Sequence, residues 1–192
     1  MFRTALNIIA CVVACLVMGL SVRAADAVGD EYAVYLAYLS ARGGDLSKLV
    51  VVAETADHAQ QVPPGPFDDA YMRRELSARV RVAGAPDVID DTLMESFRRV
   101  RTDTVRLDAS RLNLLHANVV PAAEAWARLA ANPWSRINVL TLSRVGFNRD
   151  GSRALFAAAV GCGPVCGGGQ YVLMATRGGQ WQIVAELATW LS

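Results

Sequence analysis

The sequence predicts an α+β fold: N-terminal helices with one early strand, then a C-terminal four-stranded antiparallel meander. Apolar residues recur at helical spacing in several segments before residue 132, and they alternate with period two from residue 137 onward. Short glycine-bearing segments separate the period-two segments, as in strands joined by tight turns. We therefore expect a helical part over residues 30–132 and a sheet part over residues 137–191.

The N-terminal segment has the features of a secretory signal peptide, so it is set apart from the fold. Arg3 supplies a positive start, residues 5–20 are apolar apart from one asparagine, and Val22 and Ala24 have cleavage-site spacing. The apolar run is short for a membrane span, which needs about 20 residues. We expect cleavage after Ala24, or alternatively after Ala27.

Residues 1–24 are thus expected to be a leader, and residues 25–192 a single α+β domain of a periplasmic or secreted bacterial protein. The alternatives are a retained membrane anchor and lipidation, since Cys11 and Cys15 each close a segment that resembles a lipobox. Contact with a membrane is expected only in those two cases. The partner is unknown.

The charge balance argues against nucleic acid as a partner. Two of the 19 basic residues, Arg3 and Arg23, lie in the leader, so the mature chain has 17 basic and 18 acidic residues. No basic stripe stands out from this near-neutral background, and such a stripe is the usual electrostatic mark of a nucleic-acid-binding surface.

Four helices are expected in the helical part, and the stretch Lys48 to Thr55 after the first of them contains a short buried strand, Leu49 to Ala53. The first helix ends at a glycine pair, and the third has Thr92 and Glu95 at the spacing of a capping box. Residues 106–120 read as irregular. We expect the charged helices to cover one face of the sheet. The four helices are Glu31 to Ala41, Asp68 to Val80, Thr92 to Arg101 and Pro121 to Ala131.

The sheet part is read as four strands joined by three turns, which predicts antiparallel pairing between neighbours. The turns are Asn148 to Gly151, the glycine-rich run from Gly161 to Gly169, and Arg177 to Gly179. The strands are Val139 to Phe147, Arg153 to Gly161, Gln170 to Thr176 and Gln180 to Leu191.

Cys162 and Cys166 are the only cysteines after the leader, and they favour a structural disulfide across the glycine-rich turn in an exported chain. Two functional interpretations of the cysteine pair stay open. The pair of thiolates suits Cu(I), and a dithiol can act in redox exchange. Copper sites of this kind recruit a histidine, and the chain offers His58 and His116. Neither a metal nor another cofactor is expected.

No established catalytic motif is present, and no residue is predicted to be catalytic. Glu54 and His58 are four residues apart with Asp57 between them, a spacing that on a helix would place an acid and a base on one face. Because this segment follows a strand and enters a Gln- and Pro-rich loop, it is interpreted as a solvated turn. His116 is interpreted as a core or loop histidine.

Other polar and aromatic groups have structural interpretations. Asp68-Asp69 and Asp90-Asp91 stand at helix starts, where acidic residues are common. An arginine-rich set is interpreted as a mixed, solvated helix face rather than an anion site, because Glu75, Glu95 and Asp103 are interspersed with it. These arginines are Arg73, Arg74, Arg98, Arg99 and Arg101.

The aromatic side chains are interpreted as packing residues rather than as a ligand platform. They are Trp126, Trp134, Tyr171 and Trp181.

The C-terminal third resembles a group of secreted bacterial proteins of uncharacterised activity. The resemblance lies in Ser143-Arg144-Val145-Gly146-Phe147-Asn148, Asp150-Gly151, Cys162-Gly163, Cys166-Gly167 and Trp181. It implies export and a sheet stapled by a disulfide, with no mechanism. The layout of helices followed by a meander is also similar to the nuclear-transport-factor-2-like cone, a fold that hosts many functions.

Two functional hypotheses follow. The first is an exported, non-enzymatic binding or interaction domain, whose ligand is an envelope component, a small molecule or a toxin. The alternative is a thiol-redox or copper-handling accessory protein that uses Cys162 and Cys166, with His116 or His58. A pocket with a convergent acid, histidine and arginine would favour an enzyme, and a dry pocket or a flat patch would favour binding.

The mature protein, purified after export, is expected to begin at Ala25 or Val28, because the small residues before these positions suit cleavage by a signal peptidase. Intact-mass spectrometry measures this directly. An intact Met1, or a lipid on Cys11 or Cys15, would contradict the expectation.

Overall fold

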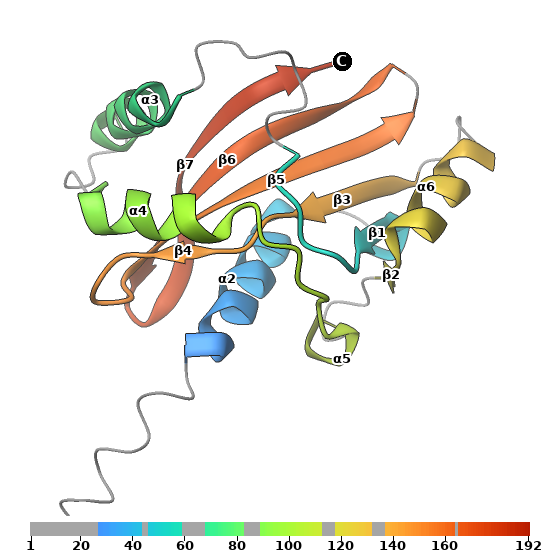
Figure 1. Cartoon of the computed structure of the whole chain (residues 1–192), viewed down its shortest axis with the longest axis horizontal. Coiled ribbons are helices and arrows are strands. Elements are labelled where there is room, and N and C mark those ends of the chain that lie inside the picture. The colour runs from blue at the N-terminus through green and yellow to red at the C-terminus, as the bar shows by residue number, and fades with distance from the viewer. Residues whose placement is uncertain are drawn as a thin grey trace, which may run out of the picture.

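The computed structural model describes residues 27–43, 46–58, 68–82, 89–112, 118–131, 137–163 and 165–192. Within these residues the chain forms one seven-stranded mixed sheet with helices against both of its faces (Figure 1). The leader lies outside the described residues, as do His116 and Trp134. The α+β class is confirmed.

The strand order is β2-β1-β3-β5-β6-β7, and β4 pairs with β5 beside β3. β1 runs parallel to both β2 and β3, whereas every pairing from β3 to β7 is antiparallel. The predicted C-terminal meander is therefore confirmed. The strands are β1 Leu49–Val52, β2 Asn118–Val120, β3 Asn138–Leu142, β4 Gly146–Phe147, β5 Arg153–Gly163, β6 Cys166–Arg177 and β7 Gln180–Leu191.

The four predicted helices are present, with ends that differ by a few residues from those expected. The segment predicted to be irregular, residues 106–120, contributes a short helix and a second early strand, β2. The helices are α2 Ala27–Arg42, η1 Leu46–Lys48, α3 Asp69–Val82, α4 Asp91–Val100, α5 Ala109–Leu112 and α6 Ala122–Ala131.

The capping box predicted from Thr92 and Glu95 is wrong by two residues. Asp90 is the N-cap of α4, with extended backbone angles (φ −88°, ψ 170°), and its carboxylate accepts a 2.8 Å hydrogen bond from the amide of Leu93. Thr92 lies inside the helix, and its hydroxyl donates to the same carboxylate of Asp90.

The first predicted strand of the meander is interrupted. β3 and β4 both pair with β5, but residues 143–145 leave the ladder between them. The fully buried Ser143 bridges the gap, since its amide donates to the Ala157 carbonyl and its hydroxyl accepts from the Ala157 amide at 2.8 Å. A side chain thus completes the hydrogen bonding that a regular strand would supply.

Helices cover both faces of the sheet, so the expectation that they cover one face is wrong. On one face, the Tyr35 and Tyr38 rings of α2 meet Phe156 edge-on, at centroid distances of 5.9 and 5.1 Å. α3, α4 and α6 lie against the other face, where Leu155 and Ala157 point. The reason lies in β5, which is apolar and buried at every position from 154 to 159 and needs cover on both sides.

Gly146 provides a test of how closely α4 lies on the sheet. A Cβ at this position would overlap the backbone of Phe97 in α4, so Gly146→Ala is expected to lower the free energy of unfolding by about 2–3 kcal/mol. Urea denaturation measures the loss.

Gly151→Ala is the matched control, because Gly151 has a φ of 70° and nothing within 4 Å of its Cβ position. It should cost only about 1 kcal/mol through backbone strain. Equal losses for the two variants would show that α4 is not in close contact with β4.

Candidate functional site

The connecting segment, residues 54–58, runs from the end of β1 across neighbouring parts of the fold. The Thr55 amide donates to the carbonyl of Val105, and the Ala56 amide donates to the carbonyl of Leu142 at the end of β3, both at 2.9 Å. The fully buried Thr55 hydroxyl accepts from the Val105 amide and donates to a further backbone carbonyl, each at 2.8 Å. The path of the segment is therefore set by its neighbours on both sides.

The acidic side chains of the connecting segment have structural partners. Glu54 Oε2 accepts a 2.8 Å hydrogen bond from the Ala122 amide in the first turn of α6, where a carboxylate also suits the helix dipole. The Asp57 side chain is only 7% exposed, and its carboxylate lies 3.7 Å from Arg101 Nε. The interpretation of these residues as a solvated turn is wrong, because the segment is packed between α6 and α4.

His58 is the last residue of the connecting segment, and its backbone carbonyl is hydrogen-bonded to a side chain of β7, the edge strand farthest from β2. Its carbonyl accepts a hydrogen bond from Trp190 Nε1 in β7, at 3.2 Å. Burial lowers the pKa of the His58 imidazole below its usual value of 6.5, while the nearby Asp57 carboxylate opposes that shift. The imidazole is therefore neutral at pH 7.

The glycine-rich run is strand rather than turn over most of its length, which corrects the predicted turn from Gly161 to Gly169. β5 extends to Gly163 and β6 begins at Cys166, so most of the run belongs to the two strands. Of the glycines in this run, Gly163 alone has a positive φ, 150°. The conformational freedom of glycine is therefore needed at one position, and the others require a different explanation.

For Gly161, Gly167 and Gly169 that explanation is close contact with tryptophan. A Cβ at Gly161 would lie 2.9 Å from Cζ3 of Trp126, and a Cβ at Gly167 would lie 3.1 Å from Cη2 of Trp190. Because glycine has no side chain, both indole rings can approach the backbone of the sheet. Gly161 and Gly167 are paired residues of β5 and β6, so the two rings stand over neighbouring strands.

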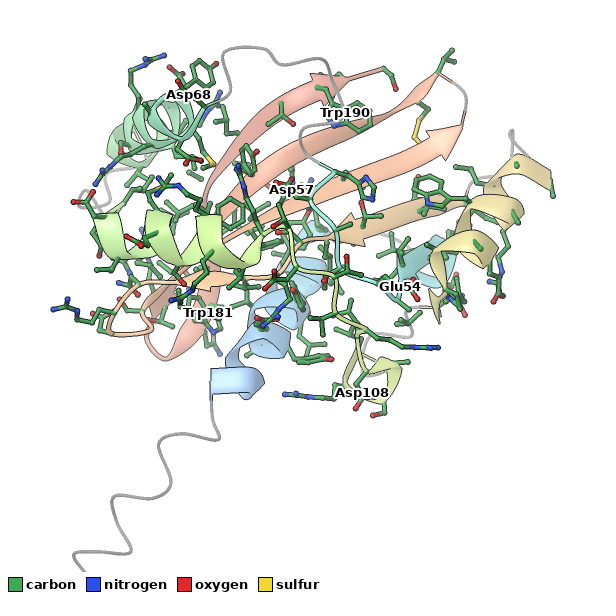
Figure 2. All side chains as sticks on the ribbon, in the orientation of Figure 1. Glu54, Asp57, Asp68, Asp108, Trp181 and Trp190 are labelled. Carbon is green, nitrogen blue, oxygen red and sulfur yellow. A yellow bond between two sulfur atoms is a disulfide. The ribbon has the colours of Figure 1, made fainter. Side chains whose placement is uncertain are left out.

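A partly open groove of about 180 Å³ lies between these two rings. α6 supplies Trp126 and Leu129, β7 supplies Trp190, the connecting segment supplies His58, and the sheet supplies Ala159 and Cys166. We call this set of residues the tryptophan groove. Figure 2 shows Trp190 near the disulfide at the end of the β5–β6 hairpin, with Asp57 and Glu54 farther along the connecting segment.

The disulfide between Cys162 and Cys166 is present, with a Cα–Cα distance of 5.1 Å. It closes the end of the hairpin beside the tryptophan groove, and Cys166 lines that groove. Within the described residues, no group of three or more His, Cys, Asp or Glu side chains is placed to hold a metal ion.

The remaining predicted positions have structural roles. Tyr171 is fully buried in the core, and Trp181 packs against Phe147 with ring centroids 6.1 Å apart, as expected for packing residues. Trp126 differs, because it is 41% exposed and forms a wall of the groove. Asp68 caps the start of α3 through the Tyr71 amide.

Four of the five arginines in the candidate anion set form ion pairs with acidic side chains, in agreement with a mixed helix face. Arg101 is the most buried of the four, with 18% of its side chain exposed, and it lies between two carboxylates. The pairs are Arg73–Asp91, Arg74–Glu75, Arg98–Asp69, Arg101–Asp57 and Arg101–Asp69.

Comparison with protein-family models, with curated proteins and with solved structures gave no match. The resemblance to secreted bacterial proteins and the analogy to the cone fold thus stay predictions. In the described part of the chain, none of the helices combines the length and the apolar character that crossing a bilayer requires.

The disulfide is expected to be structural, so replacing Cys162 and Cys166 together with Ser should lower the free energy of unfolding by about 1 kcal/mol, the low end for a short loop. The sheet should still form, because the strands bury most of the apolar surface. Urea denaturation and far-ultraviolet circular dichroism measure the two effects. Two free thiols in protein purified from the oxidising compartment would contradict a structural bond.

Proposed function

We propose that this chain is an exported, non-enzymatic binding domain that holds a small uncharged ligand in the tryptophan groove. The supporting observation is the pair of indole rings, Trp126 and Trp190, which flank a floor of small residues. Concave sites that are mostly apolar, with a few polar groups, are the usual form of small-molecule sites. The neutral His58 and the buried Thr141 add polar atoms to the lining of this groove.

The size of the groove limits the ligand. An apolar cavity of about 150 Å³ holds one benzene molecule. The tryptophan groove, at about 180 Å³ and open on one side, fits a single ring or one end of a longer apolar chain. Its lining contains no Asp, Glu, Lys or Arg side chain among the described residues, so an uncharged ring would not strip water from a charged side chain there.

Export is supported by two independent features. The leader has the composition of a signal peptide, and the disulfide between Cys162 and Cys166 suits an oxidising compartment. A periplasmic or secreted domain would meet envelope components and small molecules from outside the cell, which are the ligand classes the groove can take.

The proposal is tested with N-phenyl-1-naphthylamine, an uncharged dye whose emission rises in apolar surroundings. The native protein should bind the dye, and Trp126→Ala should weaken binding by about tenfold, the equivalent of about 1.4 kcal/mol of lost contact. Ala159→Leu, which fills the floor of the groove, should also weaken it. Fluorescence titration measures both effects.

Val105→Ala is the control, because Val105 is as exposed as Trp126, at 41%, and does not line the groove. Its affinity for the dye should equal that of the native protein. If Trp126→Ala and Ala159→Leu both fold and bind the dye as tightly as the native protein, the groove is not the binding site.

The second candidate is thiol-redox exchange, which is favoured by one observation. His58 and Cys166 line the same groove, so an imidazole lies on the side of the disulfide where a small thiol would bind. This function requires a reduction potential well above about −300 mV, the upper bound for structural disulfides. A titration against glutathione separates the two candidates, and stoichiometric Cu(I) uptake by the reduced protein would indicate copper handling.

A further inference from the structure

The end of the β5–β6 hairpin contains no cross-strand pair of side chains. In each of its last four rungs, at least one of the two facing residues is glycine. Facing side chains are what normally stabilise one strand against its neighbour. Within the hairpin, this end is therefore held by backbone hydrogen bonds and by the disulfide. The rungs are Ala159–Gly169, Val160–Gly168, Gly161–Gly167 and Gly163–Cys166.

Cys162 is the extra residue of a β-bulge at this end. Gly161 pairs with Gly167 and Gly163 pairs with Cys166, so Cys162 has no opposite residue on β6. β3 pairs with β5 only as far as Gly161. Beyond that rung the disulfide is the covalent link between β5 and β6, and the yellow bond near the end of the hairpin in Figure 2 marks its position.

The same end of the hairpin supplies one side of the tryptophan groove. Gly161, Gly163 and Cys166 all line the groove. The two indole rings lie against Gly161 and its partner Gly167. A movement of this backbone would thus change the lining of the groove and also displace the surface on which both rings rest.

We propose that the disulfide regulates the tryptophan groove, which binds its ligand about tenfold more tightly when Cys162 and Cys166 are bonded than when both are thiols. This inference rests on the proposed binding function and adds redox control to it. The physical cause is conformational entropy, since fixing the backbone of one residue changes an equilibrium constant by about a factor of ten.

Glycine has more backbone freedom to lose than any other residue, so the end of the hairpin is costly to order once the disulfide is opened. In the reduced protein this ordering accompanies ligand binding and weakens it. In the oxidised protein the backbone is ordered beforehand, and a preorganised site binds more tightly.

Oxidation of the cysteine pair is a thiol–disulfide exchange with a small-molecule disulfide such as oxidised glutathione. One cysteine thiolate attacks the oxidant and displaces the first thiol, and the second cysteine then attacks the mixed disulfide and displaces the other. The protein loses two electrons and two protons, and the oxidant is reduced to two thiols. On the proposed export route, the groove is completed only in the oxidising compartment.

Control of binding by oxidation requires the reverse effect, because the two equilibria are linked. A ligand that prefers the oxidised protein by about tenfold lowers the reduction potential of the disulfide by about 30 mV when it saturates the groove. The bound ligand therefore protects the disulfide from reduction. A disulfide that is not coupled to the groove would show no such shift.

Two titrations with N-phenyl-1-naphthylamine test the inference on the mature protein without its leader. In the first, affinity for the dye is measured before and after reduction with dithiothreitol, and it should fall about tenfold while the far-ultraviolet circular dichroism stays the same. In the second, the protein is equilibrated with mixtures of reduced and oxidised dithiothreitol. Saturating dye should lower the reduction potential by about 30 mV.

Three variants serve as controls. Cys162→Ser combined with Cys166→Ser should bind the dye like the reduced native protein and should not respond to dithiothreitol. Ala159→Leu fills the floor of the groove, so its reduction potential should be equal with and without the dye. Val165→Ser changes a residue between the two cysteines that is 75% exposed and does not line the groove, and this variant should respond to reduction like the native protein.

The two proposals fail in different ways. Equal affinity of the oxidised and reduced native protein for the dye, with no shift in reduction potential, would overturn the redox control and leave the binding function standing. If neither form binds the dye, the binding function itself is wrong. Loss of the circular dichroism signal on reduction would show that affinity falls through unfolding, and tighter binding by the reduced protein would show that the disulfide does not preorganise the groove. Either result would overturn the inference.

Discussion

The arrangement of the fold depends on the connecting segment, residues 54–58, because it is tied to many neighbours over a short length. Glu54 caps α6, the Ala56 amide donates to the end of β3, and Asp57 faces Arg101 just beyond α4. Trp190 completes the set by donating to the His58 carbonyl. Elements from the two edges of the sheet are thereby linked through one short piece of chain, most of whose polar groups are removed from water and need these partners.

The contacts between indole rings and glycine backbones also create the tryptophan groove. Trp126 and Trp190 come from α6 and β7, which lie on either side of the β5–β6 hairpin. Each ring occupies the space that a side chain would fill on Gly161 or Gly167. The rings can therefore lie close to the sheet and leave a hollow between them. These two glycines are thus required by the groove and not by the turn of the hairpin.

β7 is an edge strand, and two bulges interrupt its pairing pattern. Its register against β6 shifts twice, which leaves Val184 and Thr189 as extra residues on β7. Bulges of this kind bend a strand and disturb the pattern of free amides and carbonyls that another strand would need for pairing. Trp190 directly follows the second bulge, which brings its ring onto the face that carries the groove.

Local patterns in the sequence determined the helices, the meander and the disulfide. Helical spacing and period-two alternation depend only on nearby residues, and two cysteines with three residues between them can bond within one hairpin. The same reasoning failed where the outcome depends on distant partners. The packed state of Glu54 and Asp57, and helices on both faces, each required contacts that a local pattern does not contain. The unbroken apolar run of β5 was the one sequence signal for cover on both faces.

The groove itself was decided by tertiary structure alone. Trp126 is 35 residues before Gly161 in the chain, and Trp190 is 132 residues after His58, the residue whose carbonyl it contacts. Their proximity follows from the parallel β1–β3 pairing, which brings the early half of the chain beside the meander. A run of glycines in the sequence indicates that something approaches the backbone closely, but only the folded sheet identifies the two indole rings, because strand register sets which residues lie opposite one another.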